Sequence, residues 1–183
     1  MRLKTLAILG AVAAVAGAAG WFTALEVIPR YATDVMWAQF EKGGMKPNRL
    51  SPARIRTAKT AKVVADNADT LTRSAIIDLA DGPVVFTADV PADDRYWSVS
   101  LFAHNTDTYF VTNDRKTGPG PYRLLIRTKD QTAPAGVAVD DVAVSPSRKS
   151  FLIIRAIMRD RNDLAEAQAL QAQVMKSEVA PAR

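Results

Sequence analysis

The sequence predicts a mainly-β protein, a jelly-roll-like antiparallel β-sandwich with an N-terminal transmembrane helix and a C-terminal helix. Three observations predict this fold class. The 183-residue chain opens with a long uncharged apolar run, continues with short segments of alternating apolar and polar residues, and ends with a capped helical segment. These segments divide the chain into an anchor (1–29), a short helix with a basic linker (30–62) and a sandwich domain with its C-terminal helix (63–183).

The N-terminal anchor is predicted from the twenty consecutive uncharged residues Leu6–Leu25. At about 1.5 Å per residue, this run crosses a hydrocarbon layer of about 30 Å. Arg2 and Lys4 precede it, which favours a single pass with a cytoplasmic N-terminus, and Pro29 predicts a break in the helix. The alternative is a cleaved secretory signal, because the small residues at 16–18 suit a signal peptidase. Both interpretations export the rest of the chain.

The segment after the anchor is basic. A short amphipathic helix is predicted from Thr33 to Lys42, and a stretch rich in glycine and proline follows it as a linker. The basic residues of this segment are Lys42, Lys46, Arg49, Arg54, Arg56, Lys59 and Lys62, with no acidic residue among them. From position 63 onward acidic residues outnumber basic ones, so the net charge of +5 does not predict nucleic-acid binding. The linker suits either anionic lipid head groups or simple solvation.

Seven strands are predicted in the sandwich domain, because apolar and polar residues alternate there with a period of two. They cover residues 73–79, 84–90, 95–103, 108–112, 122–128, 137–144 and 151–158. Turn residues such as Asp81-Gly82-Pro83 separate them. We expect antiparallel pairing, because no helical crossover pattern lies between the strands. A final helix is predicted from Asp163, whose spacing from Glu166 is that of a capping box.

The composition leaves few side chains for catalysis. The chain has no cysteine and one histidine, which excludes thiol nucleophiles, Cys-ligated zinc and iron–sulfur clusters. His104 and Asp107 are the candidates for acid–base catalysis, and a strand-end histidine equally fits a structural role. No serine lies in a G-x-S-x-G elbow. Asp66, Asp69, Asp107 and Asp114 are scattered aspartates of the kind that cap turns, so we predict no metal and no cofactor.

A set of polar residues at the predicted strand ends is the candidate ligand-binding site. Their side chains suit hydrogen bonds to a polar ligand, and they equally suit turns and ion pairs. The set consists of Asn67, Asp69, Thr70, Arg95, Tyr96, Asn105 and Asp114. Arg95 in particular could pair with an aspartate and order the sandwich.

Several spaced motifs resemble those of a known family. They are NADTL at 67–71, SA at 74–75, DLADGPVV at 78–85, RYWS at 95–98, GPY at 120–122 and DLA at 163–165. Together they resemble the domain-of-unknown-function 1254 family over about residues 63–175. The resemblance implies a jelly-roll-like sandwich. It also implies a short form anchored in the inner membrane of Gram-negative bacteria, because longer relatives carry helices where this chain has its anchor.

The same resemblance suggests a companion. Longer relatives carry a second domain, of the 1214 family, in one chain, so a separate protein of that family is the expected partner. We therefore favour a non-catalytic periplasmic module that binds a partner protein or an envelope ligand. Two alternatives stay open: a periplasmic hydrolase or isomerase that uses His104 or the loop aspartates, and a lipid-binding module that uses the basic linker.

Overall fold

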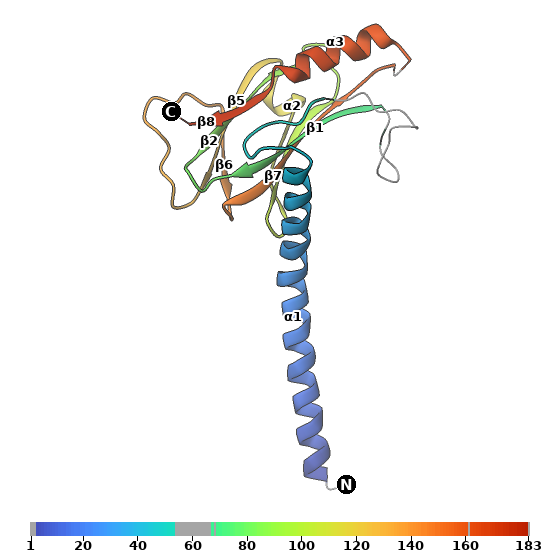
Figure 1. Cartoon of the computed structure of the whole chain (residues 1–183), viewed down its shortest axis with the longest axis vertical. Coiled ribbons are helices and arrows are strands. Elements are labelled where there is room, and N and C mark those ends of the chain that lie inside the picture. The colour runs from blue at the N-terminus through green and yellow to red at the C-terminus, as the bar shows by residue number, and fades with distance from the viewer. Residues whose placement is uncertain (1–2, 54–66, 68, 161, 183) are drawn as a thin grey trace.

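The computed structural model describes residues 3–53, 67, 69–160 and 162–182. A long helix, α1 (Leu3–Lys42), projects from one end of a two-sheet β-domain. The C-terminal helix, α3 (Leu164–Met175), lies at the other end of that domain (Figure 1). The mainly-β class, with an N-terminal apolar helix and a C-terminal helix, is confirmed.

Helix α1 is continuous, so the predicted break at Pro29 and the predicted separate helix from Thr33 to Lys42 are wrong. A proline inside a helix removes one backbone hydrogen bond, here the bond to the carbonyl of Leu25. The helix continues because its second half is held by the domain, where Thr33 and Trp37 are buried. Its most apolar 18-residue window has a mean hydropathy of 1.8 and is entirely unburied, so α1 is long and apolar enough to cross a membrane.

The first sheet has the strand order β1-β7-β3-β4, and every pairing in it is antiparallel. Its strands are β1 (Thr70–Asp78), β7 (Lys149–Ile157), β3 (Trp97–Ala103) and β4 (Thr108–Asn113). The second sheet has the order β6-β5-β2-β8. Its strands are β6 (Asp141–Ser145), β5 (Gly120–Thr128), β2 (Val84–Val90) and β8 (Glu178–Pro181). A single helical turn, α2 (Asp114–Thr117), follows β4.

The pairing of β5 with β6 corrects the expectation of purely antiparallel sheets, because these two strands run parallel. The chain returns between them through residues 129–140, a loop long enough to replace a crossover helix. The strand predicted at 137–144 begins only at Asp141. Asp140 lies beside β5 just before β6 begins: its carboxylate accepts the backbone N–H of Arg123, and its own N–H donates to the carbonyl of Arg123.

The core lies between the two sheets and uses the alternation that the sequence displays. In the first sheet Leu101 pairs with Leu152, and in the second Phe86 pairs with Leu124; all four side chains are fully buried. Trp97 joins them and packs edge-on against Tyr122 at 6.1 Å between ring centroids. The strand β8 was not predicted. It adds to the edge of β2 and closes the second sheet.

Candidate functional site

The structure divides the predicted ligand-binding residues between the two ends of the first sheet. At the end far from the α1 stem, Thr70 pairs with Ile157, whose N–H donates to the carbonyl of Tyr96. The carbonyl of Asp69 accepts the N–H of the next residue, Met158. The starts of β1 and β3 thus flank the end of β7, and this brings Asp69, Thr70 and Tyr96 together, with Arg95 beside them.

Two other members of the predicted set also lie at this far end and have structural contacts. The Oδ1 atom of Asn67 accepts the backbone N–H of Asp69 at 2.9 Å. The Oδ1 atom of Asp114 accepts the N–H of Trp97 at 3.1 Å, so this carboxylate caps the start of β3. Both contacts are those of turn and strand-end residues.

His104, Asn105 and Asp107 lie at the opposite end, in the turn after β3. Eight residues of extended chain separate Tyr96 from His104, which is about 26 Å. The Nδ2 atom of Asn105 donates to Asp107 at 2.7 Å, and the carbonyl of Asp107 accepts the N–H of Ala103, so these residues stabilise a tight turn.

The separation of the two ends of the sheet decides whether the predicted aspartates can act together. Asp69 and Asp114 lie at one end of the sheet and Asp107 lies at the other, so these three carboxylates cannot converge on one ion or one substrate. Asp66 lies outside the described residues. Among the residues that the structure describes, no group of three or more His, Cys, Asp or Glu side chains is placed to hold a metal ion.

The His104 ring contacts the stem. Its Nε2 atom lies 3.0 Å from Oδ1 of Asp34 on α1, and the same oxygen accepts a hydrogen bond from Nζ of Lys149. No described serine or threonine hydroxyl bonds the ring. Ser147 is near, but its hydroxyl accepts the backbone N–H of His104 and donates to the carbonyl of Lys149. The histidine therefore joins the stem to the domain, and among the described residues no hydroxyl nucleophile is hydrogen-bonded to its ring.

The basic segment runs away from the apolar part of α1. Lys42 lies 14 residues after Ile28 in one helix, which is about 21 Å along the axis and two Debye lengths at 0.1 M salt. Lys46 and Arg49 follow on the path that leads to the edge of β1, and all three are exposed. Arg54, Arg56, Lys59 and Lys62 lie outside the described residues.

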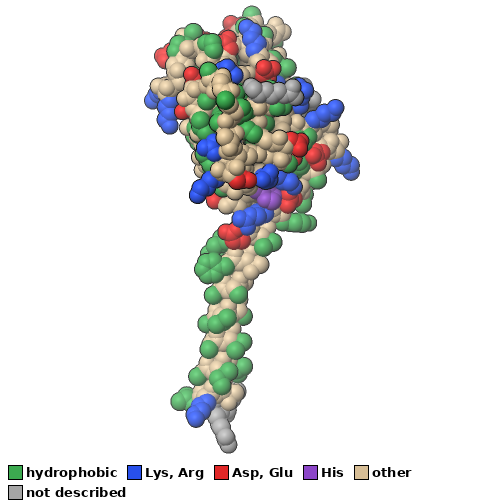
Figure 2. Space-filling view, turned by 90° about the vertical axis from the view of Figure 1, so that its left-hand side faces the viewer, with side chains coloured by type: hydrophobic (Ala, Val, Ile, Leu, Met, Phe, Trp, Pro, Cys, Tyr) green, Lys and Arg blue, Asp and Glu red, His purple; other side chains and the backbone are tan. Residues whose placement is uncertain are grey.

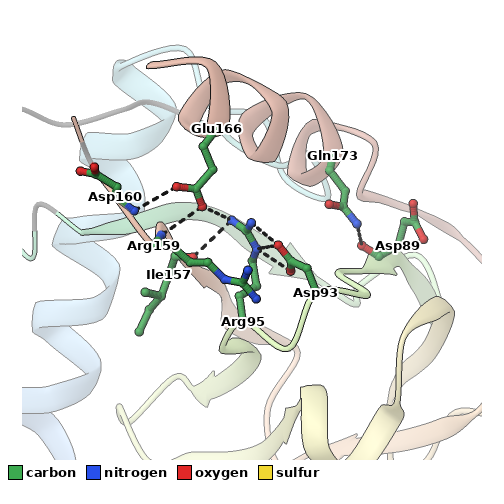
Figure 3. Close-up of polar contacts among 8 residues, drawn as sticks. All are labelled: Asp89, Asp93, Arg95, Ile157, Arg159, Asp160, Glu166 and Gln173. Atoms are coloured by element: carbon green, nitrogen blue, oxygen red, sulfur yellow. Dashed lines mark hydrogen bonds and ion pairs between the residues drawn. The ribbon is translucent and has the colours of Figure 1, made fainter. Parts of the chain in front are cut away.

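A groove of about 430 Å³ lies at the far end of the domain, between the turn that joins β2 to β3 and helix α3 (Figure 3). It is lined by Ala92, Asp93, Arg95, Glu166, Ala169, Leu170 and Gln173. Asp94, which has a φ of +59°, turns the chain between Asp93 and Arg95 so that their side chains meet. On the other wall, Nε2 of Gln173 donates to the carbonyl of Asp89 and ties α3 to β2.

Arg95 lies at the centre of the groove, and most of its guanidinium N–H groups are paired with carboxylates. Its Nε donates to both oxygens of Asp93, at 2.7 and 2.8 Å, and Nη2 also pairs with that carboxylate. Nη1 lies 3.1 Å from Oε1 of Glu166 and 3.5 Å from the carbonyl of Ile157. The side chain is only 9% exposed. A bidentate pair with a further carboxylate neutralises this guanidinium, so the groove is not a site for an anion.

Glu166 joins three segments at this point. Besides Arg95, its two oxygens accept the backbone N–H groups of Arg159 and Asp160, at 3.1 and 2.9 Å. Its own N–H donates to Asp163, which is the N-cap of α3 as predicted. The Glu166 side chain does not return to the N-cap as a capping box requires. It reaches instead to the chain that leaves β7.

The electrostatics of the groove follow from these contacts. The hydrogen bonds from Arg95 hold the pKa of Asp93 below its ordinary value, and Asp93 in turn raises the pKa of Arg95. Backbone N–H donors, first that of Asp160, lower the pKa of Glu166. All three groups therefore stay charged over the physiological range.

The sequence motifs do not indicate Asp93 or Gln173 as site residues, and they predict only a helix-capping role for Glu166. The two-residue spacing of Asp93 and Arg95 across a turn is a signal for the first pair, because such a turn brings both side chains to one side. Nothing in the sequence indicates the pairing of Arg95 with Glu166, since 71 positions separate them.

The fold and the groove define a class: a two-sheet β-domain on an apolar helical stem, with a neutralised groove and no described catalytic constellation. The family profile described as "Protein of unknown function (DUF1254)" matches residues 47–177. The chain belongs to this family. No curated protein matches it.

A solved structure shows the same fold. The VPA0106 protein from Vibrio parahaemolyticus is similar with a TM-score of 0.69 and 16% identity, over 88% of this chain and 36% of that one. An uncharacterized protein from Burkholderia cenocepacia has a TM-score of 0.44 and 15% identity, over 60% of this chain and 31% of that one. The chain thus spans about a third of the length of each.

Proposed function

We propose that this protein is a single-pass inner-membrane protein with a cytoplasmic N-terminus, whose periplasmic domain binds a partner protein at its membrane-distal end. The length and apolarity of α1 support the anchor, and the charges of Arg2 and Lys4 support the orientation. A partner is a better fit than a small polar ligand, because the groove has already neutralised its one arginine.

The observation that carries the proposal is the apolar surface beside the groove. Tyr96 and Ile157 are 45% and 37% exposed at the end of the first sheet, and Leu164 is 62% exposed on the first turn of α3. Exposed aromatic and aliphatic side chains beside a groove with a neutralised centre are typical of a protein-binding surface. A partner that covers them needs no strong charge of its own. The companion expected from the family resemblance, a protein of the 1214 family, is the first candidate.

The distal end is also the accessible end. Ile28, the last residue of the exposed apolar part of α1, lies six residues before Asp34, which contacts the base of the domain, and this is about 9 Å of helix. Strand β7 then extends by about 26 Å to Ile157. The groove therefore stands at most about 35 Å above the hydrocarbon layer, where a soluble or a membrane-bound partner can reach it.

Site-specific photo-crosslinking in intact cells tests this function. A photoreactive residue at Tyr96 should form a discrete adduct with one polypeptide, identified by mass spectrometry, and the same residue at Val142 is the matched control. Val142 is also 45% exposed but lies on β6 of the second sheet. The variant Leu164→Glu should reduce the Tyr96 adduct several-fold. Equal adducts from both positions, or none from Tyr96, would contradict the proposed surface.

A further inference from the structure

The junction between α1 and the first sheet combines an apolar contact with a polar one. The apolar part consists of Trp37 and Phe40 on α1 against Phe151 on β7. The ring centroids of Trp37 and Phe151 are 6.0 Å apart at 78°, and those of Phe40 and Phe151 are 5.7 Å apart at 57°. Ile76 is packed with them and fully buried. This contact holds the helix against the sheet.

The polar part is formed by Asp34, His104 and Lys149. One oxygen of Asp34, Oδ1, lies 3.0 Å from Nε2 of His104 and 3.0 Å from Nζ of Lys149. The two partners come from different segments, the turn after β3 and the start of β7. Lys149 also lies 5.4 Å from the centroid of the Trp37 ring, so it bridges the polar and apolar contacts. Figure 2 shows the histidine between acidic and basic side chains where the stem meets the domain.

A third contact fixes the chain where it leaves the helix. Asn48 forms a reciprocal pair with Asp78 on β1: its Nδ2 donates to the carbonyl at 2.8 Å, and its Oδ1 accepts the N–H at 2.9 Å. Its own N–H donates to the carbonyl of Ile76. The segment that follows the stem is therefore attached to β1, while the stem itself contacts β7 and the turn after β3.

These contacts have different geometric properties. Burial of Trp37 and Phe40 is favourable over a range of helix rotations, because the hydrophobic effect is non-directional. A hydrogen bond loses most of its strength when its angle falls below about 120°, so an oxygen shared by two donors accepts only a narrow range of rotations. The aromatic side chains thus hold the helix against the sheet, whereas the hydrogen bonds to Asp34 set the rotation of the helix relative to the sheet.

We propose that Asp34, His104 and Lys149 form an orientation latch that fixes the rotation of the domain about its membrane stem. This inference rests on one part of the proposed function, namely that α1 spans the bilayer, and it does not depend on partner binding. Its consequence is that the distal groove and the surface around Tyr96 face one direction relative to the membrane. A domain on a flexible tether would present them in many directions.

Spin-label distance measurements on the full chain in lipid nanodiscs test the latch. The chain has no native cysteine, so Tyr31→Cys and Val142→Cys give one unique pair of labels, on the stem and on β6. Both positions are exposed. The otherwise unchanged protein should give one narrow distance distribution, and Asp34→Ala should broaden it at least about twofold while the circular dichroism spectrum is unchanged.

The controls separate the latch from other effects. Asp130→Ala removes a similar exposed ion pair, that of Asp130 with Arg148, and should leave the distribution narrow. Lys149→Gln is a second latch variant and should also broaden it. A broad distribution in the unchanged protein, or a narrow one in both latch variants, would overturn the latch. A mass that lacks the N-terminal residues would instead refute the anchor, and this measurement is independent of the distances.

Discussion

Substitution of Arg73 should lower the free energy of unfolding of the domain more than substitution of any exposed arginine. Arg73 is 5% exposed on β1, and its donors bond carbonyls of other segments. Nε donates to Ser51 at 2.6 Å, and Nη1 donates to Val174 and Ser177, both at 2.9 Å. The carbonyl of Val174 belongs to the last turn of α3, where a cation also compensates the helix dipole.

The magnitude follows from these three bonds. Each charge-assisted hydrogen bond lost costs about 1.5 kcal/mol, or about 4.5 kcal/mol in total. Methionine in place of Arg73 recovers roughly 1.5 kcal/mol, because no buried cation then has to be desolvated. Arg73→Met should therefore lower the free energy of unfolding by about 3 kcal/mol, and the Tm of the domain by roughly 10 °C.

Thermal unfolding followed by circular dichroism of the full chain in detergent measures this effect. Arg123→Met is the matched control, because Arg123 also lies on a strand but is exposed, and it should change stability by no more than about 0.5 kcal/mol. A Tm for Arg73→Met within about 2 °C of the control would refute the assignment of these carbonyl bonds as stabilising.

Three further substitutions test other parts of the fold by urea unfolding. Tyr122→Phe removes a 2.8 Å bond to Asp141 and should cost about 1 kcal/mol at pH 7. Burial raises the pKa of the Tyr122 hydroxyl, so the unfolded chain releases this proton at a lower pH than the folded chain does. The free energy of unfolding should therefore fall above about pH 10, and it should fall less in Tyr122→Phe. Equal losses of stability in the two proteins would contradict this. Asp93→Asn should cost less than about 1 kcal/mol. Because Arg95 lowers the pKa of Asp93, the difference from the unchanged protein should be complete above about pH 4 and should shrink as the pH falls through the lowered pKa. A difference that grows on acidification would count against it. Gly82→Ala should cost about 1–2 kcal/mol, because φ is +132° there, and an unchanged unfolding midpoint would exclude that strain.

The sequence predicts the sheets well where alternation is strict. Strand β2 is predicted with the observed bounds, Val84–Val90, because its apolar residues face the core at every second position. The strand β8 has no such pattern: of Glu178–Pro181 only Val179 is buried, and the strand exists because the edge of β2 is available to it. Local pattern cannot indicate a strand whose stability comes from its neighbour.

The same limit explains the candidate site. Strand ends are readable from the sequence, so Thr70, Arg95 and Tyr96 were placed at strand ends, where they lie. Which ends meet depends on strand order, and β1 lies beside β7 and not beside β2. That order separates Asp107 from Asp69 by the length of the sheet. It also brings Arg95 to Glu166, which sequence spacing does not show.

The segment that leaves the stem connects the latch to the groove. After Asn48 the chain runs along β1, and the backbone of Ala53 is bonded to α3 through Gln171 at 2.6 Å and through the sulfur of Met175 at 3.2 Å. Arg73 binds both this segment and the last turn of α3. Helix α3 forms one wall of the groove, so the position of this wall depends on the segment that follows the stem and on Arg73. Loss of Arg73 should therefore weaken partner crosslinking at Tyr96 below the melting temperature of the variant, whereas Gly82→Ala, in the turn after the opposite end of β1, should not.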